Sequence, residues 1–200
     1  QNKYLLAFNG SIFNYLEIRG ELRSYGVIFT TDSDTEVVMY ALAIWGEKAL
    51  EKFDGMFSIV FYNKVESTII IARDKLGIKP LYYFLDKDKL IFSSEIKPII
   101  KHPLVKKEFN KEVVEEFFAF QSLMPPNTFF KNIKVLEPGK LITIDIENTK
   151  KALFKVYWDL INCMHNNDND LNVDEQIIAS LEKCWRADRN IGIQLSGGID

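Results

Sequence analysis

The sequence predicts an α+β fold, with helices covering antiparallel sheets, followed by the first helix and strand of an α/β domain. Successive hairpins between residues 56 and 92 indicate antiparallel sheets. The strand expected over residues 56–62 is almost entirely apolar, and such a strand is covered on both faces. Near the end of the chain, an apolar run over residues 191–195 precedes the loop Ser196-Gly197-Gly198. A strand followed by a glycine loop is how an α/β nucleotide-binding domain begins.

The composition is that of a globular protein. The 200 residues are 47% apolar, 26% charged and 13% aromatic, with a formal net charge of −3. No basic cluster favours nucleic acid, and no apolar run approaches the ~20 residues of a membrane helix. We therefore expect binding neither to nucleic acid nor to a membrane. Cys163 and Cys184 have no metal-binding or disulfide spacing, which predicts no metal site and a reducing, cytoplasmic location.

The first part of the chain mixes short strands and helices. We expect a strand over residues 4–8 that ends at the turn signal Asn9-Gly10. A helix is expected over residues 15–25, with Asn14 as its N-cap, and a strand over residues 27–30. A largely apolar, buried helix follows the polar residues 31–34, and a short helix is expected over residues 48–53.

The central part of the chain contains the hairpins. Strands are expected over residues 56–62, 68–72, 81–85 and 89–92, with Asp86-Lys87-Asp88 as the second turn. Helices are expected over residues 95–101 and 111–120, and a further strand over residues 141–144. Pro125-Pro126 and Pro138-Gly139 predict irregular structure.

The composition of the sequence changes after residue 145. The polar, Asn/Asp-rich residues 162–172 predict a connection between domains. Residues 172–175 resemble a capping box, and a helix over residues 173–186 is expected because apolar residues share one face: Val173, Ile177, Ile178, Leu181 and Trp185. We therefore expect a first domain over residues 1–148, a linker over 149–171 and the truncated start of a second domain over 172–200.

Six short motifs occur in one order along the chain. They are Phe8-Asn-Gly-Ser-Ile-Phe-Asn-Tyr15, Ser33-Asp-Thr-Glu-Val37, Asp54-Gly-Met-Phe57, Arg73-Asp-Lys-Leu-Gly-Ile-Lys-Pro-Leu-Tyr-Tyr83, Phe92-Ser-Ser-Glu-Ile-Lys97 and Leu195-Ser-Gly-Gly-Ile-Asp200. Together they resemble glutamine-hydrolysing asparagine synthetases over nearly the whole chain. The resemblance implies a class II glutamine amidotransferase domain with a four-layer α-β-β-α N-terminal-nucleophile hydrolase sandwich. This sandwich is expected to be incomplete, with its N-terminal part missing, and to be followed by the start of an α/β ATP-pyrophosphatase domain.

The resemblance also implies an activity for the parent protein. Glutamine would be hydrolysed to glutamate and ammonia in the first domain. The second domain would use ATP and Mg²⁺ to convert aspartate to β-aspartyl-AMP, which ammonia would attack to give asparagine. The expected partners are therefore the small molecules glutamine, aspartate and ATP, and a homodimer is left open as the assembly.

Site residues follow from the same motifs. Asn9 and Gly10 match the family's oxyanion hole, whose fixed N–H donors stabilise a tetrahedral transition state by on the order of 3 kcal/mol each. Asp34 matches the acid that holds the α-amino group of glutamine, although a carboxylate there could also be a helix N-cap. Arg73 and Asp74 match a framework motif that supports the pocket. The family nucleophile is an N-terminal cysteine, and Gln1 is not that residue.

Ser11 departs from the family pattern, in which most members carry Glu. Serine keeps a hydrogen-bonding group but loses the charge and the reach, so Ser11 is a candidate glutamine-binding residue with a weaker expected contact. The departure leaves open a related ligase that amidates a sugar or another carboxylate in surface-polysaccharide biosynthesis. A non-catalytic remnant of the fold is a third hypothesis.

The last motif matches the pyrophosphate loop of ligases that release pyrophosphate. Its expected ATP-binding residues are Leu195, Ser196, Gly197, Gly198 and Asp200. The two glycines let backbone N–H groups converge on a phosphate, and Leu195 would contact the nucleotide through its backbone. Because the nucleophile and most of the ligase domain are expected to lie outside the chain, we expect these residues alone neither to hydrolyse glutamine nor to make asparagine.

Overall fold

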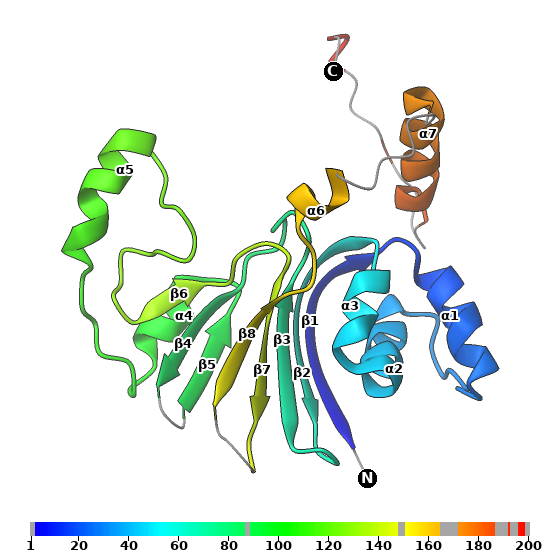
Figure 1. The fold of residues 1–200 in the computed structure, drawn as a ribbon, viewed down its shortest axis with the longest axis horizontal. Coiled ribbons are helices and arrows are strands. Elements are labelled where there is room, and N and C mark those ends of the chain that lie inside the picture. Colours follow the sequence, from blue (N-terminus) through cyan, green and yellow to red (C-terminus); the bar gives the residue numbers. More distant parts are fainter. Residues whose placement is uncertain are drawn as a thin grey trace.

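The computed structural model describes residues 3–86, 89–147, 151–164, 172–186, 192 and 196–198, and its body is built on two β-sheets (Figure 1). In this part of the chain the first sheet has five antiparallel strands in the order β1-β2-β3-β7-β8. Their bounds are β1 Tyr4–Ile12, β2 Gly55–Asn63, β3 Thr68–Arg73, β7 Lys140–Asp145 and β8 Ala152–Val156. The second sheet has the order β5-β4-β6, with β4 Tyr82–Asp86, β5 Lys89–Ser93 and β6 Ile133–Val135.

One face of the first sheet is covered by three helices, which lie beside β1 and β2 in Figure 1. They are α1 Tyr15–Ser24, α2 Asp34–Trp45 and α3 Ala49–Lys52, and a 3₁₀ turn, η1 Gly46–Lys48, joins the last two. Leu22, Leu42, Phe53, Phe57 and Phe61 are fully buried in the core between these helices and the sheet. Burial of this apolar surface holds the helices in place.

The other face of the first sheet packs on the second sheet. Val60, Ile71 and Ile142 from the first sheet meet Leu81 and Tyr83, beside and within β4. The outer face of the second sheet is covered by α4 Ile96–Lys101 and the segment that follows it. The layer order is therefore helix, sheet, sheet, helix, as expected.

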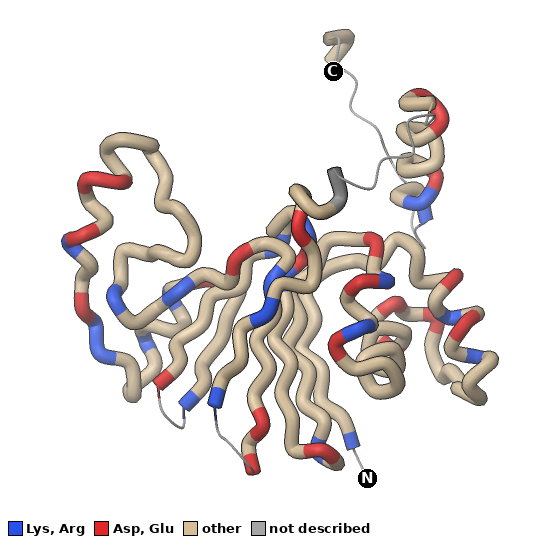
Figure 2. Tube along the Cα trace, viewed as in Figure 1, with Lys and Arg blue, Asp and Glu red and all other residues tan. Residues whose placement is uncertain are grey.

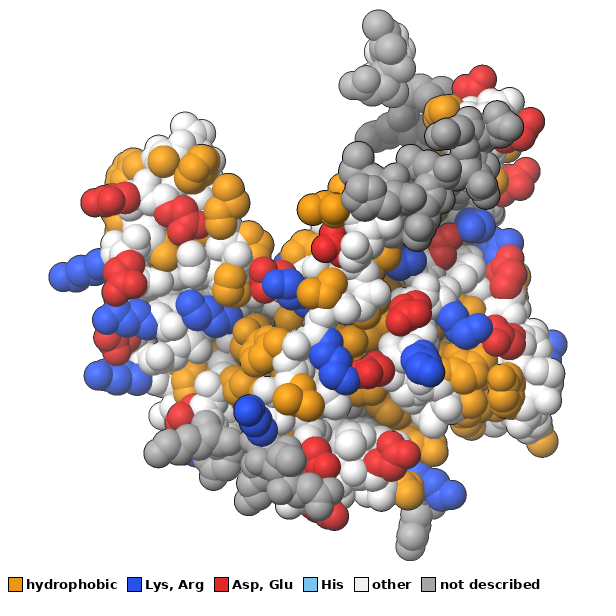
Figure 3. Space-filling view, in the orientation of Figure 1, with side chains coloured by type: hydrophobic (Ala, Val, Ile, Leu, Met, Phe, Trp, Pro, Cys, Tyr) orange, Lys and Arg blue, Asp and Glu red, His pale blue; other side chains and the backbone are white. Residues whose placement is uncertain are grey.

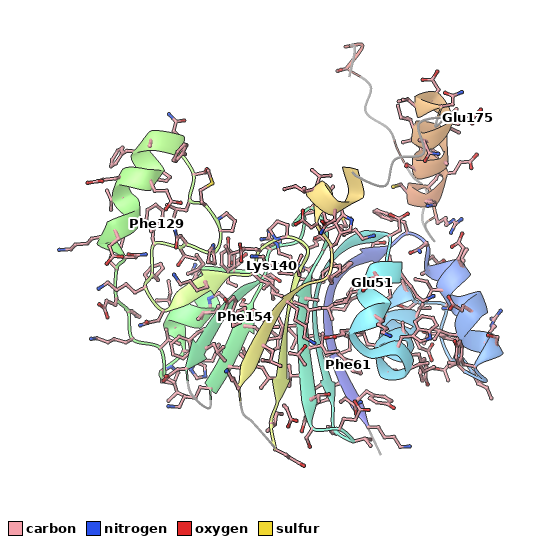
Figure 4. The ribbon with its side chains drawn as sticks, in the orientation of Figure 1. Glu51, Phe61, Phe129, Lys140, Phe154 and Glu175 are labelled. Atoms are coloured by element: carbon pink, nitrogen blue, oxygen red, sulfur yellow. The ribbon has the colours of Figure 1, made fainter. Side chains whose placement is uncertain are left out.

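An arm projects from the second sheet on the side away from α1 (Figure 1). It contains the 3₁₀ turn η2 Lys111–Val113 and α5 Val114–Phe120. Phe129, labelled in Figure 4, stacks on Phe109 with ring centroids 5.9 Å apart and meets the edge of Phe117. Orange apolar side chains gather over this arm in Figure 3. The side chain of Phe118, in α5, is 79% exposed.

The predicted turn at Asn9-Gly10 is wrong. Both residues lie inside β1, which continues to Ile12 in unbroken register with β2. Asn14 stands at the N-cap position of α1, but its side chain donates to Lys52 O and accepts from Asp54 N instead of capping the helix. Asn-Gly favours turns locally, but pairing with β2 decides the conformation here.

The predicted strand over residues 27–30 is also wrong. Val27 N donates to Leu22 O at the end of α1, and Thr30 N donates to the carboxylate of Glu36 in α2. Phe29 packs on the helical core without entering a sheet. The backbone groups of this segment are therefore satisfied by the two neighbouring helices.

The span 149–171, expected as a linker, contains regular structure. β8 pairs with β7 from Ala152 to Val156, so the first sheet continues beyond residue 148. The short helix α6 Leu160–Met164 follows. Residues 149–150 and 165–171 lie outside the described part of the chain.

The predicted helix of the second domain is present as α7 Val173–Cys184, and Asn172 accepts the N–H of Asp174 as its cap. Its apolar face is exposed, with Ile177 at 54% and Leu181 at 58%. Cys184, at the end of this helix, is exposed as well. The strand expected over residues 191–195 falls mainly outside the described residues. Among the helices in the described residues, none combines the length and the apolar composition of a membrane span.

Candidate functional site

Gly10 occupies a place in β1 where any side chain would clash with the neighbouring strand. A Cβ atom on Gly10 would lie 2.2 Å from Met56 O and 2.7 Å from Phe57 Cα on the neighbouring strand. Gly55 is under the same constraint, since its Cβ would lie 2.3 Å from Ser11 O. The close approach of β1 and β2 at this end of the sheet therefore requires glycine on structural grounds alone.

The N–H of Gly10 points away from β2. Phe57, which pairs with Gly10, donates its N–H to Asp74 Oδ2 and accepts from Asp74 N with its carbonyl, so both of its backbone groups face β3. The Gly10–Phe57 pair is consequently one without interstrand hydrogen bonds. Because β1 is an edge strand among the described residues, the N–H of Gly10 is directed to the free edge of the sheet. A donor in this position can bind an anionic oxygen.

Asp34 lies at the same edge. Ser33 caps α2 by accepting the N–H of Thr35, which places Asp34 in the first helical turn. Asp34 Oδ2 accepts the N–H of Ile12 at 3.0 Å, and this N–H points outward like that of Gly10, two residues earlier on β1. Oδ1 accepts no hydrogen bond from the described residues, so it can take a further donor such as an ammonium group.

Gly10, Ser11 and Asp34 line one pocket of about 390 Å³. This volume is within the range of about 300–1,000 Å³ that is usual for small-ligand sites. The other lining residues are Ile12, Phe13, Tyr15, Asp32, Ser33 and Arg186. The structure therefore brings together three of the four residues predicted to bind glutamine.

Asn9 is the fourth predicted residue, and it does not line this pocket. Its Nδ2 donates to Ser94 Oγ at 3.2 Å, across to the segment between β5 and α4. Asn9 and Ser11 are two residues apart on β1, so their side chains share a face of the sheet, and the bond to Ser94 holds Asn9 outside the pocket. The contact joins two of the sequence motifs, those of residues 8–15 and 92–97.

Arg19 is a residue whose part in the site the sequence did not reveal. It is only 5% exposed and donates to Thr31 O at 2.9 Å and to Ser33 O at 3.2 Å. Its guanidinium also stacks over Phe29 at 4.7 Å, and its buried Nε has no hydrogen-bond partner. Arg19 thus fixes the loop that presents Asp34, and its helical spacing gave no signal of this role.

Arg186 is a second residue whose place at the pocket the sequence did not indicate. It follows α7 and reaches the pocket from a distant part of the chain. Its Nη1 donates to Glu17 Oε2 at 2.7 Å and to Phe13 O at 3.2 Å. The hydrogen bond from Arg186 lowers the pKa of Glu17 below its usual value, and the same bond raises the pKa of Arg186. Nothing in the local sequence distinguishes it from an ordinary basic residue at a helix C-terminus.

Arg73 and Asp74 build the framework behind the pocket. Asp74 is 1% exposed, and its carboxylate accepts backbone N–H groups from Phe57, Leu76, Ile78 and Lys79. The Arg73 guanidinium donates to three carbonyl oxygens, those of Gly77, Lys79 and Leu136, and burial lowers its pKa. Both side chains form their hydrogen bonds with the surrounding backbone, as structural residues do.

The proposed ATP-binding residues are described only in part. Gly197 has a positive φ of 76°, and Gly198 N donates to Ser196 Oγ at 3.1 Å. This tight turn presents backbone without side chains, as a phosphate loop requires. Leu195 and Asp200 lie outside the described residues. Within the described residues, no group of three or more His, Cys, Asp or Glu side chains is placed to hold a metal ion.

The distribution of charged residues in the described part of the chain does not indicate a second binding site. Acidic and basic residues are interspersed over the elements in Figure 2. Lys52 pairs with Glu21 and Lys155 pairs with Glu47 at the surface. The pocket at the edge of β1 therefore remains the best candidate site.

Comparison with known proteins identifies the family of the chain. A family model described as "Glutamine amidotransferase domain" matches residues 1–158. Asparagine synthetase [glutamine-hydrolyzing] 1 of Bacillus subtilis is 36% identical over 98% of this chain and 31% of its own length. Putative asparagine synthetase [glutamine-hydrolyzing] 2 of Methanocaldococcus jannaschii is 31% identical over 98% of this chain and 38% of its own length. The chain thus spans about a third of the length of these curated relatives.

Solved structures show the same fold. Glutamine phosphoribosylpyrophosphate amidotransferase from B. subtilis aligns with a TM-score of 0.51 and 20% identity, over 79% of this chain and 30% of its own. A structure titled as the allosteric regulatory enzyme of purine biosynthesis aligns with a TM-score of 0.52 and 19% identity, over 78% of this chain and 28% of its own. Since the family model covers all but the last part of the chain, the protein belongs to the glutamine amidotransferase domain family.

Proposed function

We propose that this chain is the amidotransferase part, and the beginning of the ligase part, of a glutamine-hydrolysing asparagine synthetase. The observation that carries the amidotransferase part is the shared pocket of Gly10 and Asp34 at the free edge of β1. Curated relatives with this name match 98% of the chain, which supports the choice of aspartate as acceptor. The domain boundaries stay a proposal, with the amidotransferase domain extended to the end of β8.

The roles of the residues follow from their geometry. Asp34 Oδ1 would bind the α-ammonium group of glutamine, while Oδ2 keeps the carboxylate fixed to Ile12 N. The N–H of Gly10 would donate to the oxyanion that forms at the glutamine amide carbon. Ser11 would donate its hydroxyl to the bound substrate from the same wall. Asn9 would complete the oxyanion hole only if its side chain leaves Ser94, since it now lies outside the pocket.

The ligase part rests on the last motif. Ser196, Gly197 and Gly198 would hold the pyrophosphate of ATP with their backbone N–H groups, together with Leu195 and Asp200. Bound ATP, with Mg²⁺, would activate the acceptor carboxylate for attack by ammonia. A cytoplasmic enzyme with glutamine, aspartate and ATP as its small-molecule partners is the proposal that follows.

Two assays on the enzyme at its natural length test this function. We expect glutamate release from glutamine, and aspartate-dependent exchange between ATP and pyrophosphate. Glutamate release without exchange would contradict aspartate as acceptor and favour the second candidate, a ligase that amidates another carboxylate, to which Ser11 in place of Glu points. Absence of both activities would favour a non-catalytic remnant of the fold.

A further inference from the structure

The basic end of α7 touches the amidotransferase domain beside the pocket. Lys183 Nζ donates to Asp54 Oδ2 at 2.8 Å, and Arg186 donates to Glu17 Oε2 and Phe13 O. We call these three hydrogen bonds the α7 contact. Figure 2 shows blue at the end of α7 nearest the body and red toward its other end, an arrangement that also complements the helix dipole.

The α7 contact converges on the end of β1. Phe13 N donates to Asp54 O at 2.7 Å, so the residues bound by Lys183 and Arg186 are themselves joined. Phe13 follows Ile12, whose N–H holds the carboxylate of Asp34. Arg186 is therefore connected to Asp34 through two consecutive residues at the end of β1.

Each hydrogen bond of the α7 contact involves a charged side chain. The apolar face of α7 stays exposed, with Val173 at 69% and Trp185 at 52%, and contributes nothing to these bonds. Contacts between domains of one chain are commonly polar and reversible in this way. Residues 172–186 also lie beyond the family match, which ends at residue 158.

We propose that Arg186 is a positioning residue for glutamine, supplied to the pocket from outside the amidotransferase domain. When the α7 contact is made, Arg186 holds Phe13 and so keeps Ile12 and Asp34 in their binding geometry. When α7 moves away, this end of β1 loses its tether and glutamine binds more weakly. The affinity of the amidotransferase site thereby depends on the position of the following domain. This inference rests on the proposed function, because it assigns a regulator to the same site.

The test is a double-mutant cycle on the enzyme at its natural length. R186A, E17A and the double variant are compared for the KM of glutamine, and Arg23→Ala is the control because Arg23 lies exposed on α1, away from the pocket. We expect R186A to raise the KM of glutamine about fivefold with kcat unchanged, equivalent to roughly 1 kcal/mol for partly exposed pairs. E17A should raise the KM less, because Phe13 O still binds Arg186, and the double variant should match R186A.

Three results separate the possible outcomes. Activity with ammonia in place of glutamine should be unchanged in R186A, since ammonia bypasses the pocket. If R186A lowered the ammonia-dependent activity as well, Arg186 would have a general structural role and the inference would be overturned. Additive effects of E17A and R186A, or an unchanged KM in R186A, would overturn the inference while leaving the proposed function intact. A wild-type enzyme that does not hydrolyse glutamine would instead refute the proposed function itself.

Discussion

At the scale of single residues, Asp34 Oδ2 accepts the N–H of Ile12, and we propose that Oδ1 binds the substrate ammonium group. In D34N the amide oxygen can still accept the N–H of Ile12, so the strand end should keep its geometry. The substrate ammonium loses its charged partner, and we expect the KM of glutamine to rise by about 10- to 100-fold, as for loss of roughly 1.5–3 kcal/mol. Steady-state kinetics of glutamate release measure this change.

The control for D34N is Glu51→Gln. Glu51 lies exposed on α3, where Figure 4 labels it, and loses the same charge without a place in the pocket. Its KM should stay at the wild-type value. If D34N and the control behaved alike, the assignment of Asp34 to the ammonium group would be wrong.

Gly10 is a residue whose identity is set by packing before any chemistry. In G10A the new methyl group would meet Met56 O and Phe57 Cα, so β1 and β2 must separate. We expect the free energy of unfolding to fall by about 2–3 kcal/mol, as for overpacking at a site that cannot relax. Denaturant titration followed by circular dichroism measures the loss.

The matched control is G20A in α1. A Cβ on Gly20 meets no atom within 4 Å. Alanine is a better helix former than glycine, so G20A should raise the free energy of unfolding by about 0.5–1 kcal/mol. Equal destabilisation by both alanines would refute the packing argument for Gly10.

At the scale of elements, Arg19 joins α1 to the loop that starts α2. R19M keeps the apolar stem but leaves the carbonyls of Thr31 and Ser33 without their donor. We expect the free energy of unfolding to fall by about 2–4 kcal/mol and the KM of glutamine to rise, because the loop also positions Asp34. Thermal unfolding and glutaminase kinetics of the same variant measure the two effects.

Arg23, exposed on the same helix, provides the comparison for Arg19. R23M should leave both the melting temperature and the KM near the wild-type values. An R19M enzyme that melts with a lower midpoint but binds glutamine normally would show that the loop does not depend on Arg19 for its conformation.

At the scale of the whole molecule, Tyr157 anchors the segment that follows β8 to the body of the amidotransferase domain. Its hydroxyl donates to Arg73 O at 2.7 Å, its N–H donates to Gly139 O, and burial raises the pKa of its hydroxyl above the usual value. Y157F should lower the free energy of unfolding by about 1 kcal/mol, and the midpoint by roughly 2–4 °C. Differential scanning calorimetry measures this shift, and Tyr25→Phe, at 59% exposure, should leave it near zero.

The sequence determined the elements that carry strong local signals. The apolar runs of β2 and β3, the buried face of α2 and the capped α7 follow from side-chain pattern alone, because burial of one face or two faces fixes the period of apolar residues. The motif order also indicated the family and the candidate residues Gly10 and Asp34. Local pattern failed where distant partners satisfy the backbone, as at Asn9-Gly10 and residues 27–30.

The set of residues that share the pocket depends on long-range contacts. The direction of the Gly10 N–H depends on the pairing of β1 with β2, the fixation of Asp34 depends on Ile12, and Arg186 reaches Phe13 across more than 170 positions of the chain. These contacts are non-local, so no window of sequence contains both partners. The amino-acid pattern thus indicated a layered amidotransferase fold, whereas strand register and helix docking shape the pocket at the edge of the sheet.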